Sequence, residues 1–106
     1  MAMKILGQHA SVAGVDADLY TAPALTQTVI STISICNTTG ANSGYTIAVR
    51  GAGAVLATKH YIVKAGSIPA NSTDFITVGF TLAATDVLTV SAVASDVAFN
   101  AFGDES

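Results

Sequence analysis

The sequence has little charge. Only 10% of its 106 residues are Asp, Glu, Lys or Arg, whereas 51% are hydrophobic. Soluble domains typically have about 25% charged residues, and the surface of a solitary small domain normally carries at least that fraction. Because the composition is also too apolar for a disordered chain, we expect a folded domain with part of its surface covered by another chain.

Positive charge is especially scarce. The net charge is −3, and the positive residues are Lys4, Arg50, Lys59 and Lys64. Nucleic-acid binding depends on Lys and Arg side chains that neutralise a row of phosphates. Direct binding to nucleic acid is therefore not expected.

Cysteine pairs and long apolar runs are also missing. Cys36 is the single cysteine, so it has no intramolecular disulfide partner and is expected to act as a small buried hydrophobe. The N-terminus lacks the apolar run of a secretory signal, and no window reaches the ~20 apolar residues of a membrane helix. We expect a protein made in the cytoplasm, with no membrane partner.

The sequence is rich in β-strand patterns. Apolar and polar residues alternate in short segments, which turn residues separate at intervals of about 8–12 residues. This spacing predicts an all-β fold: a single antiparallel β-sandwich over residues 1–106, with about seven or eight strands. Immunoglobulin-like and jelly-roll orders both fit. Residues 1–15 are predicted to form a first strand or an N-terminal arm, and residues 103–106 a short mobile tail.

The alternation also predicts which side chains face the core. In residues 28–37 it places Val29, Ile33 and Ile35 on one face. The other face, with Ile30, Ser34 and Cys36, is expected to be wet or covered by a partner. The turn-forming cluster "NTTGANSG" (37–44) predicts a hairpin to the strand that follows. Elsewhere the expected apolar faces are Tyr45, Ile47 and Val49; Ile76, Val78, Phe80 and Leu82; Leu88 and Val90; and Val97 and Phe99.

Acidic residues offer two candidate constellations. Asp16 and Asp18 would begin a calcium loop, but Thr21 and Gln27 occupy the places of its required Gly and Glu. Asp86 and Asp96 begin successive predicted strands, and could approach each other as a pair of glycosidase carboxylates. Aspartates that cap their own turn are far commoner, so catalysis is not expected.

Other reactive groups lack partners at a useful spacing. His9 and His60 have no third metal donor in a known pattern. No "GxSxG" nucleophile elbow occurs, and "GAGAVLATK" (51–59) lacks the "GK[ST]" ending of a phosphate loop. The sequence therefore predicts no catalytic residue, no metal ligand and no cofactor.

One stretch indicates contact with a protein. Arg50 and "KHYIVK" (59–64) contain three of the four positive side chains, with a tyrosine between the lysines. Because Arg and Tyr are enriched in interface hot spots, the candidate contact residues are Arg50, Lys59, His60, Tyr61 and Lys64. A strand edge guarded by lysines is the alternative interpretation.

Several segments resemble a known group of proteins. "LYTAPA" (19–24), "CNTTG" (36–40), "YTIAVR" (45–50), "KHYIV" (59–63), "FTLAATDVLTV" (80–90) and "AFNAFGDE" (98–105) are together similar to small virion structural proteins of tailed bacteriophages. The pattern of that group has glycine where this chain has Leu25 and Thr85. Both residues tolerate positive φ poorly, so their turns are expected to differ in backbone geometry.

The resemblance implies a non-enzymatic role on the virion. It implies a capsid decoration, or cement, protein that is a homotrimer and binds the major capsid protein on the outside of the head. Alternatives are a neck, tail or fibre module, with or without host-surface binding, and a small ligand-binding β-barrel. The sequence has no Trp, which counts against a sugar-binding module, and its predicted inward faces are aliphatic, which counts against a ligand barrel.

Overall fold

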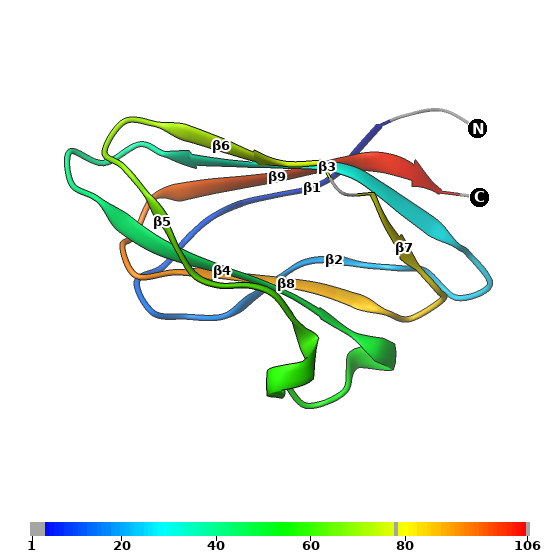
Figure 1. The fold of residues 1–106 in the computed structure, drawn as a ribbon. Helices are drawn as coiled ribbons and strands as arrows, with labels where there is room; N and C mark the ends of the chain where they lie inside the picture. The colour runs from blue at the N-terminus through cyan, green and yellow to red at the C-terminus, as the bar shows by residue number, and fades with distance from the viewer. Residues whose placement is uncertain (1–3, 78, 106) are drawn as a thin grey trace.

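Two antiparallel sheets pack face to face in the computed structural model, which describes residues 4–77 and 79–105 (Figure 1). No helix in these residues is long and apolar enough to span a membrane. In chain order the elements are β1 (Lys4–Ala10), β2 (Ala17–Thr21), β3 (Thr28–Asn37), β4 (Ser43–Arg50), the short 3-10 helices η1 (Gly51–Gly53) and η2 (Thr58–His60), β5 (Tyr61–Ile68), β6 (Thr73–Ile76), β7 (Phe80–Leu82), β8 (Val87–Ala92) and β9 (Val97–Glu105).

The strand order is that of a jelly roll. One sheet has the order β1-β9-β3-β6, with β7 also paired to β3, and the other has the order β2-β8-β4-β5. The chain is therefore wound like one long folded hairpin, in which β1 pairs with β9, β2 with β8, β3 with β6 and β7, and β4 with β5. In the immunoglobulin order the first two strands share a sheet, whereas β1 and β2 lie in opposite sheets. The predicted β-sandwich is confirmed, and its strand order is that of the jelly roll.

The predicted hairpin over residues 37–44 is wrong. β3 and β4 belong to different sheets, so this segment crosses from one layer of the sandwich to the other. Turn-forming residues indicate that the chain reverses direction, but they do not specify which strand becomes its neighbour.

Asn37 fixes this crossing. Its side chain is fully buried, and its amide nitrogen donates to the carbonyls of Ala41 at 2.8 Å and of Ile68 and Pro69 at 3.2 Å. Its side-chain oxygen accepts the backbone NH of Thr39 at 3.0 Å and the Thr39 hydroxyl at 2.7 Å. One side chain thus joins the β3–β4 crossing to the end of β5 and the loop that follows it.

The core lies between the two sheets and is aliphatic. Most inward-facing residues that the alternation predicts are buried, and Val49, Ile76 and Phe80 are half-buried against this core. Val78 lies outside the described residues. The largest fully buried apolar side chains of the core are Phe99, Ile30, Ile33, Ile35, Ile47, Ile68, Leu82, Leu88, Val90 and Val97.

A β-bulge in β3 changes the predicted face at the start of that strand. The pairing of β3 with β9 shifts between Ile30 and Thr32, and an extra residue in one strand exchanges the inward and outward positions. Ile30 is consequently buried, whereas Val29 is 44% exposed. The prediction for Ile33 and Ile35 is confirmed, and that for Val29 and Ile30 is wrong.

Both ends of the described chain lie in the same sheet. Residues 4–10, which the sequence allowed as an arm, pair with β9 as an edge strand. Residues 103–105, expected to be a mobile tail, form the end of β9.

Leu25 and Thr85 have left-handed backbone conformations. Their φ angles are +60° and +69°. Both residues therefore have positive φ, which Leu and Thr were expected to avoid. Turn hydrogen bonds hold the second turn in place: the Thr85 amide donates to the Ala22 carbonyl at 2.9 Å, and the Asp86 amide donates to the Ala83 carbonyl at 3.1 Å. The expectation of a different geometry is wrong, because the turn contacts outweigh a local cost of about 1–2 kcal/mol.

We expect Asn37→Ala to lower the free energy of unfolding by about 2–4 kcal/mol, because a fully buried side chain is truncated and its hydrogen bonds to the backbone of both connections are lost. Asn42→Ala is the matched control. Asn42 lies in the same crossing but is exposed, and its side chain accepts one backbone amide, that of Ala70, at 3.1 Å. The control should lose less than about 1 kcal/mol. Urea denaturation measures both values, and equal losses would contradict the role of Asn37.

We expect Thr85→Gly, and separately Leu25→Gly, to raise the free energy of unfolding by about 1 kcal/mol. Glycine adopts positive φ without the Cβ clash, and both side chains are exposed. Ala84→Gly is the control, and it should destabilise because it only adds freedom to the unfolded chain. Thermal and urea midpoints test the difference. A loss of stability in Thr85→Gly comparable with that of the control would refute the expectation.

Candidate interaction surfaces

Arg50, the first predicted contact residue, is engaged within the chain. It ends β4, and its guanidinium donates to the Thr89 hydroxyl at 3.0 Å and to an Asp18 carboxylate oxygen at 2.8 Å. It also donates to the carbonyls of Gly53 at 3.4 Å and Ala54 at 3.0 Å. Its side chain is only 19% exposed. Arg50 therefore anchors the segment that begins with η1 to the outer face of the four-stranded sheet.

The other four predicted contact residues lie in η2 and β5. His60 is half-buried, and its Nδ1 accepts the Ala57 amide at 3.0 Å, so it caps the η2 turn. Lys59 is exposed. The Lys64 ammonium lies 4.6 Å from the centre of the Tyr61 ring, within the range of a cation–π interaction. The segment with η1 and η2 projects beyond the four-stranded sheet (Figure 1).

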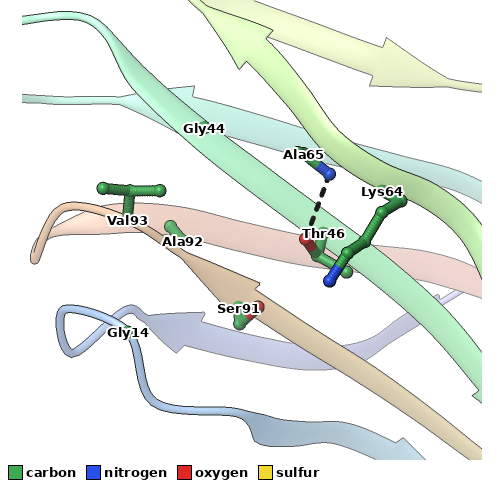
Figure 2. A pocket seen from close by; sticks show the side chains of 8 residues that line it. All are labelled: Gly14, Gly44, Thr46, Lys64, Ala65, Ser91, Ala92 and Val93. Atoms are coloured by element: carbon green, nitrogen blue, oxygen red, sulfur yellow. Dashed lines mark hydrogen bonds between the residues drawn. The ribbon is translucent and has the colours of Figure 1, made fainter. Parts of the chain in front are cut away.

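A shallow hollow of about 200 Å³ opens beside Lys64 on the outer face of the four-stranded sheet (Figure 2). Lys64 and the side chains of Thr46 and Ser91 reach its surface, and the Thr46 hydroxyl accepts the Ala65 amide at 3.3 Å. Its lining residues are Gly14, Gly44, Thr46, Lys64, Ala65, Ser91, Ala92 and Val93. An ammonium and two hydroxyls can hold a polar group, but no acid or histidine lines the hollow to serve as a general acid or base.

The two candidate glycosidase carboxylates lie at opposite ends of the sandwich. Asp86 precedes β8 and Asp96 follows it, ahead of β9, so the length of β8, about 20 Å, lies between them. Asp86 is also committed to its turn, because its two carboxylate oxygens accept the amides of Ala52 and Ala83, each at 2.9 Å. The idea that they approach each other is wrong, since an intact strand separates them.

Metal-binding residues do not gather within residues 4–77 and 79–105. No group of three His, Cys, Asp or Glu side chains lies close enough there to hold an ion.

Glu105 links the ends of the five-stranded sheet to the other sheet. One of its oxygens pairs with the Lys4 ammonium, and the other accepts the Tyr20 hydroxyl, which also lies 2.8 Å from the Thr28 hydroxyl. The hydrogen bonds from Lys4 and then Tyr20 lower the pKa of Glu105 below its usual 4.5. Burial, followed by the bond to Glu105, raises the pKa of Tyr20.

The outer face of the five-stranded sheet carries almost no charge. Its rows follow from the pairings of β1, β9, β3 and β6. The residues of three successive rows are Ile5, Phe102 and Thr32; Gln8, Asn100, Ser34 and Phe75; and Ala10, Ala98, Cys36 and Thr73. None of these side chains is ionised as a carboxylate, ammonium or guanidinium, and none is buried. We call them the uncharged face.

The rim of the uncharged face does carry charge. Asp104 is the next outward position along β9, opposite Val29.

The centre of the uncharged face is polar. Gln8 and Asn100 are joined there, where the Gln8 amide donates to the Asn100 side-chain oxygen at 2.8 Å. The most exposed large apolar side chains of the uncharged face are Phe75, at 65%, and Ile5, at 56%.

Residues of the uncharged face were not proposed as a site from the sequence. The signal was present, because the alternation in 28–37 left Ser34 and Cys36 on a face expected to be wet or covered. It was incomplete, since only the sheet order brings β1, β9 and β6 beside β3.

Comparisons with known proteins give similarity to solved structures alone. No protein-family model matches the chain, and no curated protein matches it. Among solved structures it is similar to a chain in the "Structure of infectious bursal disease virus Gx strain", with 11% identity and a TM-score of 0.43. The match covers 98% of this chain and 30% of that chain. At this identity and TM-score the similarity says nothing about function.

We expect the free energy of unfolding to fall as the pH drops below about 4.5, the usual pKa of a Glu carboxyl. A carboxylate whose folded pKa is lowered stabilises the fold above its unfolded pKa, and this contribution is lost as the pH falls through the folded pKa. Glu105→Gln should reduce the acid loss, and Lys4→Gln should reduce it partly. Urea denaturation from pH 7 to pH 2 measures it, and an unchanged acid loss in Glu105→Gln would contradict the assignment.

Proposed function

We propose that the chain is a non-enzymatic structural protein of a tailed-bacteriophage virion. Within that class, we propose a capsid decoration protein that binds the outer surface of the head as a homotrimer. The observation that carries the proposal is the uncharged face. Charge depletion with exposed aromatic and apolar side chains characterises the centre of a protein interface rather than free surface.

The segments that resemble phage virion proteins support the proposal through the roles of their residues. "CNTTG" (36–40) contains Asn37 and Thr39 of the sheet crossing, and "FTLAATDVLTV" (80–90) contains Asp86, whose carboxylate holds a turn. "YTIAVR" (45–50) ends at Arg50, which anchors the η1 segment. The resemblance thus concerns residues that build the fold, as expected of a protein whose function is to be packed against.

Decoration stabilises a shell by mass action. A protein that binds only the assembled, expanded shell contributes about 2.7 kcal/mol per site when its free concentration is a hundred times the dissociation constant. A trimer suits the three-fold junctions between capsid subunits, because closed symmetry lets each chain repeat the same contact. No chemical step is needed for this effect.

The test is co-sedimentation with expanded phage heads that lack decoration, with unexpanded heads as the control. We expect saturable binding to expanded heads, at a copy number tied to their symmetry axes, and light scattering should give the mass of a trimer. A chain that ignores expanded heads but sediments with tails or binds host cells would contradict decoration and favour the neck, tail or fibre alternative.

A further inference from the structure

We infer that the uncharged face is the surface on which a second copy of this chain docks. The inference deepens the proposed function, on which it rests for the expectation that the protein is an oligomer. It assigns the self-contact to one side of the sandwich, the outer side of β1, β9, β3 and β6.

The size of the uncharged face fits a protein partner. Its three rows run from Thr32 to Cys36 on β3, which is about 20 Å along the strands, and four strands spaced about 4.8 Å apart are about 19 Å wide. The flat area is therefore somewhat below about 400 Å², and the relief of the side chains adds to it. A standard protein interface buries about 800 Å² on each partner, and its centre is depleted of charge while its rim is polar, so the face has the size and chemistry of the centre of one protein contact.

Absence of charge restricts the chemistry of the partner. A charged side chain that docks on this face loses water and meets no opposite charge in the three rows, which is costly. The matching surface must therefore also be uncharged. The opposite outer face does not qualify, because it carries Asp18, Arg50 and Lys64.

The uncharged face itself meets this requirement. Ser34, Asn100 and Gln8 can each donate and accept hydrogen bonds. In a trimer whose uncharged faces surround the three-fold axis, one side of each face meets the opposite side of the next face, so the copies can satisfy one another's polar groups. Phe75 and Ile5 lie on edge strands on opposite sides of the sheet, where they can cover apolar surface on the neighbour. With a net charge of −3 on every copy, contact through an uncharged surface also keeps the acidic groups of the copies apart.

Asn100→Asp is the sharpest test. It keeps the side-chain oxygen that accepts from Gln8, and adds one negative charge at the centre of the uncharged face. Asn42→Asp is the matched control, because it makes the same change in an exposed loop off the face. Light scattering and sedimentation velocity should give an oligomer for the wild type and the control. For Asn100→Asp, the dissociation constant of self-association should rise at least tenfold.

A second variant and a second readout guard against misfolding. Phe75→Ser changes a side chain that is 65% exposed, so it should weaken association while circular dichroism and the urea midpoint stay near wild type. Cys36 is half-buried on the same face, and its maleimide labelling should slow as the protein concentration rises. In Asn100→Asp, labelling should stay fast.

Three results would overturn the inference. The first is a monomeric wild type at ~100 μM, a concentration far above the dissociation constant of a specific interface. The second is an oligomer whose mass and Cys36 labelling are unchanged in Asn100→Asp. The third is an Asn100→Asp variant that stays oligomeric but loses binding to heads, because the face would then contact the capsid. A wild-type oligomer that Asn100→Asp dissociates, but that does not bind heads, would support the inference and refute decoration.

Discussion

The buried side chain of Asn37 is the contact on which the arrangement of strands depends. A jelly roll requires the chain to cross between sheets instead of returning beside itself, and each crossing leaves backbone carbonyls that no ladder satisfies. Asn37 supplies donors to three of them and accepts from Thr39. An apolar residue there would remove these bonds, including the one to the carbonyl of the buried Ile68, so the polar side chain stabilises the crossing.

Several charged side chains have a structural partner within the chain. Asp86 holds its turn, Arg50 anchors the η1 segment, and Glu105 joins Lys4 to Tyr20. A general acid, base or nucleophile must be free to meet a substrate. These side chains instead carry the connections of a sandwich with an aliphatic core.

The two outer faces of the sandwich differ in chemistry. One carries the Asp18–Arg50 pair and the Lys64–Tyr61 contact beside a hollow, which suits exposure to water. The other has charge only at its rim, and its three central rows expose Phe75 and Ile5 among hydroxyl and amide side chains. The low charge of the sequence is thus unevenly distributed, and the proposed self-contact uses the side where it is lowest.

The sequence by itself determined the fold class and most of the core, because period-two alternation is local. Tyr45, Ile47, Leu88, Val90, Val97 and Phe99 could be assigned inward from their neighbours in the chain, and all are buried. Only the tertiary structure decided that β3 and β4 lie in opposite sheets, that a bulge turns Ile30 inward, that Leu25 and Thr85 keep positive φ, and that Asp86 and Asp96 are a strand apart. These outcomes, and the joining of four separate segments into one uncharged face, depend on contacts between residues distant in sequence, which alternation and turn propensity do not encode.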